Sequence, residues 1–247
     1  MKLAFFGYGA MNRLVEARAL DEGHEVIARF SSRDTGRSPQ DFAEALRGAD
    51  AAIDFSRADA VPTHTEACAL VGVPLVQGTT GWHTQQDEVL HAVERLGGAL
   101  IYGANFSIGV NLFYRIVARA AELIDSVPEY APFIEEAHHS RKRDAPSGTA
   151  LRLQEIVTTQ STRDVPVTST RAGFIPGTHR VGFDSLADQI MLTHTARSRE
   201  GFAAGALVAA KWIQGRRGVF KFTDLLDDVL RAHAILDVTQ ARSNGVE

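Results

Sequence analysis

The chain has 247 residues, of which 45% are hydrophobic and 23% are charged, and its formal net charge is −4 at pH 7. This is ordinary globular composition, long enough for one large domain or two modest ones, each with its own core. The mildly acidic balance gives no reason to expect a nucleic acid or an anionic membrane as a partner.

Residues 2–30 predict a strand, a helix and a second strand. Residues 2–6 form a short apolar run that ends at Gly7, residues 12–22 have helical spacing, and residues 24–30 form the second strand. This βαβ order is typical of parallel sheets. The alternation continues with strands at 51–55, 74–77 and 99–102 and helices at 41–47, 58–71 and 83–96. Five strands separated by helices predict an α/β fold with a Rossmann-type doubly wound parallel sheet.

The order of elements changes after Asn105. Strands now follow one another with fewer intervening helices, which predicts a second α+β domain with a mixed open sheet. The tail, residues 218–236, is predicted to be helical and to return to the first domain. The expected helices are 108–124, 148–160 and 198–214, and the expected strands are 129–137, 165–175, 179–184 and 188–197.

Cys68 is the only cysteine, so an intramolecular disulfide is excluded and a reducing compartment is the simplest interpretation. Its apolar surroundings favour a buried filler over a nucleophile. The apolar run at the N-terminus is too short for a signal peptide, and no stretch approaches the roughly 20 apolar residues of a membrane span. We therefore expect a soluble, cytoplasmic protein.

A glycine-containing turn joins the first predicted strand to the first helix, where a dinucleotide-binding turn would lie. Glycines let the backbone approach a pyrophosphate, which rests on the helix N-terminus. A lone GxG also occurs in many α/β turns that bind nothing, but its place in a βαβ unit favours the cofactor interpretation. The expected cofactor residues here are Gly7, Tyr8, Gly9, Ala10, Met11 and Asn12.

Cofactor choice is expected to depend on the residues after the second strand, Ser32, Arg33 and Asp34. An acid there would pair with the ribose 2′-hydroxyl of NAD, whereas serine and arginine suit the 2′-phosphate of NADP. Because Ser32 and Arg33 come first, the sequence favours NADPH or the use of both cofactors. A solvated loop is the alternative.

Three further strand ends point to the same edge of the sheet, where open α/β sheets bind their ligands. The glycines allow close backbone approach, and the threonines offer hydroxyl and N–H groups; an ordinary turn with a helix cap is the alternative for residues 78–81. The expected cofactor residues are Phe55, Gly78, Thr79, Thr80, Gly103, Ala104, Asn105 and Phe106.

Residues 136–150 combine two imidazoles, three cations and a helix start. His138 and His139 can exchange a proton near neutral pH, Lys142 lies between Arg141 and Arg143, and Ser147 caps a helix whose free N–H groups favour an anion. This predicts a site for a small anion that needs a proton. The alternatives are a zinc site at the histidine pair, which lacks a cysteine or paired carboxylates, and a solvated basic loop for the two arginines.

The pattern Glu136-x-His-His-x-x-Lys-x-Asp-Ala-Pro-Ser-Gly-Thr-Ala150 resembles the signature of the 4-hydroxy-tetrahydrodipicolinate (dihydrodipicolinate) reductase family. The resemblance extends over nearly the whole chain, through residues 78–81, 105–111, 177–181, 194–199 and 202–206. It implies reduction of 4-hydroxy-tetrahydrodipicolinate to tetrahydrodipicolinate in the diaminopimelate route to lysine. It also implies NADPH and/or NADH as cofactor, a small dicarboxylate substrate and a homotetramer assembled through second-domain sheets.

The resemblance also implies roles for single residues. His138 matches the proton donor, Lys142 a second catalytic donor, His139 a substrate contact, and Gly148 with Thr149 the grip on a substrate carboxylate. We expect a dinucleotide-binding domain at 1–105 with 215–247, and a substrate-binding and oligomerisation domain at 106–214.

The nucleotide turn departs from the family pattern, because it is a residue shorter and Met11-Asn12-Arg13 replaces Met-Gly-Arg. This departure concerns cofactor preference rather than the type of reaction. Two alternatives remain: another nicotinamide-linked reductase, such as an aspartate dehydrogenase, and a redox-sensing module that holds NADP without chemistry. The His138/Lys142 pair argues against the module, which needs no proton donor.

Overall fold

The computed structural model describes residues 1–161 and 163–243. The chain forms two compact units: residues 1–107 together with the chain from 202 onward, and residues 108–201. Residues 202–214, which the sequence-based division gave to the second domain, lie with the first unit. Several of their apolar side chains are fully buried, among them Ala203, Ala206 and Leu207.

The first unit is built on a six-stranded sheet in the order β10-β5-β4-β3-β1-β2, in which every pair is parallel. The central strands are short and apolar, and both of their faces are covered, as expected for parallel sheets. The strands are β1 (Lys2–Phe6), β2 (Glu25–Phe30), β3 (Ala51–Asp54), β4 (Leu75–Gln77), β5 (Ala99–Tyr102) and β10 (Gly218–Lys221).

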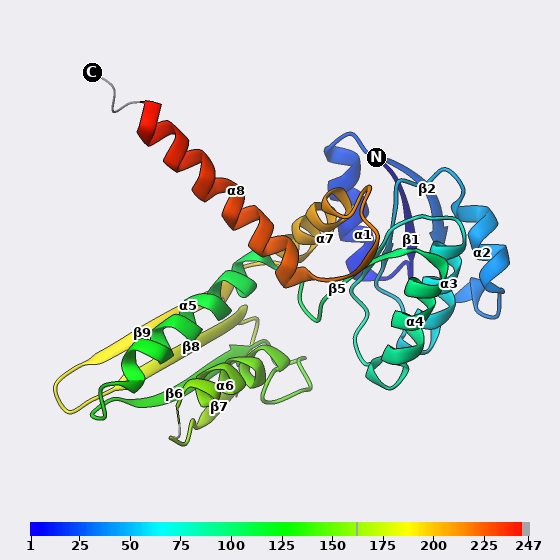
Figure 1. The fold of residues 1–247 in the computed structure, drawn as a ribbon. Helices are drawn as coiled ribbons and strands as arrows, with labels where there is room; N and C mark the ends of the chain where they lie inside the picture. The colour runs from blue at the N-terminus through cyan, green and yellow to red at the C-terminus, as the bar shows by residue number, and fades with distance from the viewer. Residues whose placement is uncertain (162, 244–247) are drawn as a thin grey trace. The chain divides into compact units, whose positions relative to one another are not determined.

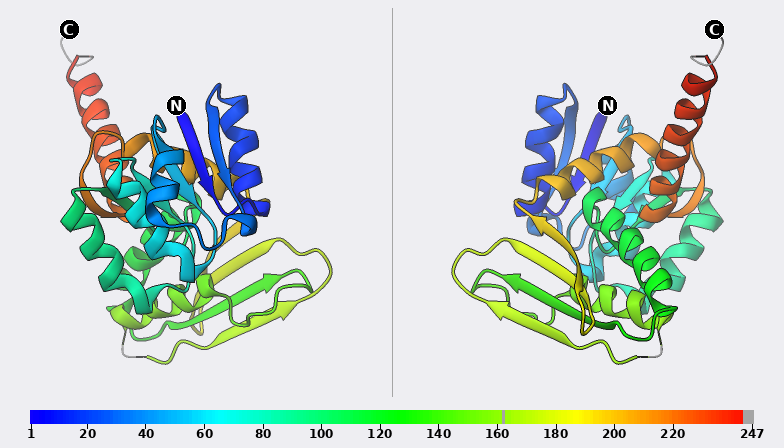
Figure 2. Two further views of the ribbon diagram at one scale, coloured as in Figure 1. Left: turned by 90° about the vertical axis from the view of Figure 1, so that its right-hand side faces the viewer. Right: turned by 90° about the vertical axis from the view of Figure 1, so that its left-hand side faces the viewer.

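Helices cover both faces of this sheet (Figures 1 and 2). Phe42, Cys68 and Val89, from α2, α3 and α4, share one apolar cluster with the sheet. On the other face α1 and α7 lie together, linked by an ion pair of 2.9 Å between Glu22 and Lys211. The predicted doubly wound fold is confirmed. The helices are α1 (Ala10–Asp21), α2 (Pro39–Leu46), α3 (Val61–Leu70), α4 (Gln86–Leu96), α7 (Glu200–Trp212) and α8 (Phe222–Ser243), with short 3₁₀ turns η1 (Ser32–Asp34), η2 (Ala58–Ala60) and η3 (His83–Gln85).

The prediction of a helical tail from residue 218 was wrong at its start. Gly218–Lys221 is the strand β10, which pairs in parallel with β5, Val219 opposite Leu100. Four residues are too few for a periodic pattern, and the open edge of β5 supplies the hydrogen-bond partners that decide the conformation. The helix α8 begins only at Phe222.

The second unit holds a mixed sheet in the order β7-β6-β8-β9, as predicted. β6 and β7 are parallel, and the other pairs are antiparallel. Helices α5 and α6 pack on one face over a core that includes Val117, Leu153, Ile134 and Val181. The elements are α5 (Ile108–Asp125), β6 (Ala131–His138), α6 (Gly148–Gln160), β7 (Val167–Arg171), β8 (Gly177–Asp184) and β9 (Gln189–Ala196).

Cys68 is buried as expected, and its burial raises the pKa of the thiol well above the usual value. A buried protonated thiol is a poor nucleophile. Within the described ranges, no helix has both the length and the apolar character that crossing a membrane requires.

Candidate active site

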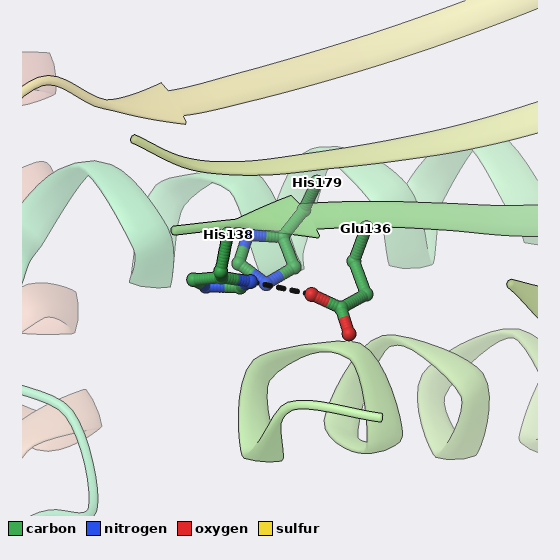
Figure 3. Close-up of side chains that lie close together, drawn as sticks. All are labelled: Glu136, His138 and His179. Atoms are coloured by element: carbon green, nitrogen blue, oxygen red, sulfur yellow. Dashed lines mark hydrogen bonds and ion pairs between the residues drawn. The ribbon is translucent and has the colours of Figure 1, made fainter. Parts of the chain in front are cut away.

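Three neighbouring strands bring four polar side chains together at one end of the second sheet. Glu136 and His138 are two residues apart on β6 and therefore share a face. Arg171 on β7 lies opposite His138, and His179 on β8 lies opposite Glu136. Figure 3 shows the Glu136 carboxylate and the His138 ring turned toward each other, with the His179 ring beside them.

Glu136 is the centre of this cluster, and only 2% of the residue is exposed. Arg171 donates to both carboxylate oxygens at 2.6 and 3.0 Å, His138 Nδ1 lies 2.5 Å from Oε2, and the Ser147 N–H donates to Oε1 at 3.3 Å. Burial opposes ionisation, but the hydrogen bonds from Arg171, Ser169 and His138 outweigh it and lower the pKa of Glu136 to about 2. Glu136 is therefore an anion at every physiological pH.

His138 is held through one ring nitrogen only. Burial lowers its pKa below the usual value, and the hydrogen bond and charge of Glu136 partly offset that effect. The hydrogen bond to Glu136 goes through Nδ1, and no side-chain hydrogen bond of Nε2 is seen in the described part of the chain. Gly177 at the start of β8 leaves space beside it, since a Cβ there would lie 3.0 Å from Nε2. This nitrogen is the one available to a bound molecule.

His179 packs against His138, with 5.1 Å between the ring centroids. Burial lowers the pKa of His179 to about 4, so the ring is neutral near pH 7. Its Nε2 lies 2.9 Å from Ser147 Oγ, which also accepts the Ala150 N–H at 3.2 Å and caps α6. Ser147 therefore caps the helix, as the sequence predicted, and only 2% of the residue is exposed.

The loop between β6 and α6 carries Lys142, predicted as catalytic, and His139, predicted to contact the substrate, and the first turn of α6 carries Gly148 and Thr149. Lys142 is largely buried and pairs with Asp144 at 2.8 Å. His139 Nδ1 is buried and has no hydrogen-bond partner in the structure described. Gly148 and Thr149 open α6, where backbone N–H groups lack intrahelical acceptors, and a Cβ on Gly148 would meet only open space. An anion can reach these N–H groups.

Glu136, His138 and His179 form the single three-residue group in the described ranges whose ligand atoms could share a metal ion, lying within 4.8 Å of one another. The zinc alternative considered from the sequence paired His138 with His139 instead. Both oxygens of Glu136 already accept from the Arg171 guanidinium, which would repel a second cation. The cluster is built for hydrogen bonding to an imidazole.

The glycine turn before α1 was predicted to bind the pyrophosphate of a dinucleotide. Gly7 has φ +79°, and a Cβ there would lie 2.5 Å from Ser56 Cα. Gly9 precedes α1 and offers no capping side chain, so the first N–H groups of the helix stay open to an anion. Asn12 is buried and its amide donates to the carbonyls of Phe6 and Gly7 at 2.7 and 2.8 Å. Asn12 thus holds the turn with its side chain.

Tyr8 of this turn donates its hydroxyl to Glu16, which also accepts from Arg29 at 2.6 Å. The Arg13 guanidinium lies 5.3 Å from the centre of the Tyr8 ring. Sequence reasoning missed Glu16 and Arg29, because the contact between α1 and β2 depends on the fold. The guanidinium groups of Arg13 and Arg29 therefore both lie close to Tyr8.

Asp54, at the end of β3, accepts hydrogen bonds in a buried network next to two of the loops predicted to bind the cofactor. Its carboxylate accepts from the Thr79 hydroxyl at 3.1 Å, the Ser56 N–H at 2.8 Å and the Gln77 amide at 3.0 Å, and it lies 2.8 Å from His64 Nδ1. The Thr79 hydroxyl is therefore used internally. The exposed Thr80 is the one with a side chain open to a ligand.

Aromatic packing shapes the remaining strand ends. The Phe55 ring lies on Gly78, where a Cβ would come within 2.2 Å of it, and makes an edge contact with Phe106 at 6.0 Å. Gly103 packs against Phe222, and Asn105 Oδ1 accepts the Ser107 N–H at 2.9 Å. Ala104 is exposed. Glycine at position 78 is required by the ring that covers it.

Ser32 and Arg33 are exposed in η1, directly after β2. The Asp34 carboxylate makes its contacts within its own turn. It accepts the Ser31 N–H at 2.9 Å and pairs with Arg37 at 3.3 Å. These contacts, the Ser31 backbone hydrogen bond foremost, lower the pKa of Asp34. The Asp34 carboxylate, which could otherwise accept a hydrogen bond from a ribose hydroxyl, is therefore already hydrogen-bonded.

Comparison with known proteins matches both units to one family. Residues 1–106 match "Dihydrodipicolinate reductase, N-terminus", and residues 109–226 match "Dihydrodipicolinate reductase, C-terminus". A 4-hydroxy-tetrahydrodipicolinate reductase of Christiangramia forsetii is 33% identical, over 94% of this chain and all of the relative. One of Archaeoglobus fulgidus is 34% identical, over 92% of this chain and all of the relative.

Solved structures show the same fold. A dipicolinate-bound dihydrodipicolinate reductase from Paenisporosarcina sp. TG-14 has a TM-score of 0.75 at 21% identity, covering 90% of this chain and 97% of that one. An amine dehydrogenase from Mycobacterium smegmatis has a TM-score of 0.57 at 12% identity, covering 89% and 94%. The fold is thus also found in an amine dehydrogenase.

Proposed function

Because this chain belongs to the dihydrodipicolinate reductase family, we propose that His138 delivers the proton, and Lys142 the balancing positive charge, in the family's reaction. That reaction is the NAD(P)H-dependent reduction of 4-hydroxy-tetrahydrodipicolinate to tetrahydrodipicolinate, a step of the diaminopimelate route to lysine. The observation that carries the proposal is the surroundings of His138. A free Nε2, a neighbouring ammonium and an open helix N-terminus belong to one unit.

The first unit is the cofactor domain in this proposal, and bound NAD(P)H supplies the hydride. The open N-terminus of α1 receives the pyrophosphate, and the Gly7 backbone allows its close approach. NADPH is the preferred cofactor, because Asp34 is occupied by its own turn while Ser32 and Arg33 remain exposed. The other residues proposed to contact the cofactor lie in the turn before α1, in its first turn, and after β3, β4 and β5. They are Tyr8, Gly9, Ala10, Met11, Asn12, Phe55, Gly78, Thr79, Thr80, Gly103, Ala104, Asn105 and Phe106.

The second unit is the substrate domain in this proposal. One carboxylate of the substrate binds the N–H groups of Gly148 and Thr149, and His139 contributes a further substrate contact. Lys142 exchanges its pairing with Asp144 for the substrate and stabilises the charge that develops on reduction. His138 Nε2 then gives its proton to the reduced, electron-rich ring system.

Replacement of His138 by glutamine tests the proposal. Turnover is expected to fall by about 10²-fold or more, because general acid catalysis supplies about that factor, while the Kd for NADPH stays near the wild-type value. His91→Gln, at an exposed position on α4, is the control. Oxidation of NADPH and NADH is followed with freshly generated substrate, and wild-type turnover in His138→Gln would exclude His138 as the donor.

The outer face of the second sheet supports assembly into a homotetramer. Helices α5 and α6 pack on the inner face, whereas the outer face presents exposed threonines on two strands. They are Thr168, Thr170, Thr193 and Thr195. A second copy of this chain can pack against such an exposed face. Light scattering is expected to give the mass of four chains, and Thr193→Glu a smaller assembly; a wild-type monomer would contradict this.

A further inference from the structure

We propose that Glu136, held by Arg171, is the positioning residue that fixes which ring nitrogen of His138 faces the substrate. This inference rests on the donor role proposed for His138 and adds the group that prepares the imidazole for it. Glu136 touches neither substrate nor cofactor in this account. It acts through the histidine alone.

The first step is the direction of the hydrogen bond between Glu136 and His138. An ionised carboxylate can only accept, so the proton in the 2.5 Å contact belongs to His138 Nδ1. Neutral imidazole carries one N–H, and Nε2 is therefore left with its lone pair. The hydrogen bond that holds His138 uses Nδ1, and Nε2 lies beside Gly177, where the absence of a side chain leaves space.

The second step is that the carboxylate cannot turn away. Its side chain is completely buried, and Arg171 binds both oxygens while donating a third hydrogen bond to the Asp144 carbonyl at 2.6 Å. Such a two-point contact fixes the plane of the carboxylate as well as its place. The plane of the carboxylate in turn fixes the His138 ring.

The third step links the proton donor to the anion site. Oε1 of Glu136 also accepts the Ser147 N–H, and Ser147 immediately precedes the two N–H groups assigned to the substrate carboxylate. One buried side chain thus sets the distance between the imidazole and the start of α6. Errors of about 1 Å at this distance are costly for catalysis.

The proton balance of the cycle follows from this arrangement. Protonated His138 carries hydrogen on both nitrogens; the Nε2–H bond breaks as the proton passes to the reduced substrate, and the electron pair stays on Nε2. The ring returns to the neutral form with Nδ1–H still bonded to Glu136, and solvent water restores the proton on Nε2. Glu136 remains ionised throughout and stabilises the imidazolium.

Glu136→Gln is the informative change. The glutamine oxygen remains the acceptor for Arg171, so its NH₂ group faces His138 Nδ1 and selects the opposite tautomer. Turnover is expected to fall by about 10²- to 10⁴-fold with an unchanged Kd for NADPH. Glu135→Gln is the matched control, because this next residue on β6 is half-exposed, lies on the other face and pairs with Arg180. Wild-type turnover in folded Glu136→Gln would overturn the proposal.

The pH profile separates positioning from a purely structural role. The charged or titratable groups around His138 are Glu136 on β6, Arg171 on β7, His179 on β8, and Lys142 with Asp144 in the loop. Loss of the Glu136 charge removes the anion in contact with His138, while the Arg171 and Lys142 cations that lower its pKa remain. The alkaline fall of kcat/KM is therefore expected at lower pH in Glu136→Gln, and an unshifted fall would contradict the proposal.

Nitrogen NMR of wild-type protein with ¹⁵N-labelled histidine decides the matter even if the variant does not fold. At pH 8 the His138 signals, assigned by their loss in His138→Gln, are expected to show Nδ1 protonated and Nε2 bare. The opposite tautomer would overturn the proposal. This result is independent of the donor role: an active His138→Gln enzyme with the expected tautomer would refute the proposed function and leave the positioning intact.

Discussion

At the scale of single residues, Gly177 has no room for a side chain because the His138 ring lies against it. A Cβ at Gly177 would lie 3.0 Å from His138 Nε2, closer than side chains normally approach. Gly177→Ala is expected to displace the ring and lower turnover about tenfold, a loss of the size that misorientation of a catalytic group causes, with little change in melting temperature. Thr178→Ser on the same strand serves as control. Unchanged kcat in Gly177→Ala would show that the ring is not held tightly there.

Sequence reasoning found the histidines and the helix start but not the residues that hold them. His138, His139 and the Ser147 cap lie in one contiguous pattern, so local chemistry sufficed. Arg171 is 35 residues from Glu136 and reaches it only because β6 and β7 pair in parallel in one register. No local pattern predicts such a register. Glu136 stood in the quoted motif without a role for the same reason.

At the scale of elements, α7 packs so closely on the first unit that one glycine cannot be replaced. A Cβ at Gly205 would lie 1.7 Å from the carbonyl oxygen of Phe106. Glycine to alanine inside a helix ordinarily stabilises by about 1 kcal/mol, but here the helix must move away. Gly205→Ala is expected to lower the free energy of unfolding by about 1–3 kcal/mol, measured by urea denaturation. A stabilised variant would contradict this packing.

Most elements could be predicted from periodicity, and the errors have physical causes. Strands β1 and β5 and helix α6 agree with the predicted bounds, since glycines or a serine cap end their patterns. Helix α1 begins two residues earlier than predicted, at Ala10, because the glycine turn is short. β10 was missed because its conformation depends on pairing with β5, which lies far away in the sequence.

At the scale of the whole molecule, the buried cluster predicts loss of stability in acid. Burial lowers the pKa of His179 to about 4 in the folded protein. Between pH 6.5 and about 4 the unfolded chain therefore binds a proton at this residue and the folded chain does not, so stability falls as the pH drops through this range. Glu136, with a pKa of about 2, adds a further loss below its usual value of 4.5. Each contributes up to about 3 kcal/mol.

Urea denaturation at pH 7 and pH 4.5 measures this effect. His24, His138 and His194 have pKa values lowered in the same direction and add to the slope. His179→Gln is expected to show a shallower loss of stability than wild type between these pH values, while His91→Gln on the exposed face of α4 follows wild type. Equal unfolding free energies of the wild-type protein at both pH values would refute the linkage.

The most direct test of the account is a crystal structure of the enzyme with oxidised cofactor and pyridine-2,6-dicarboxylate. We expect one carboxylate on the N–H groups of Gly148 and Thr149, and His138 Nε2 within hydrogen-bond reach of the ligand ring system, with Nδ1 still on Glu136. An imidazole turned away from the ligand, or a dicarboxylate bound far from the start of α6, would contradict it.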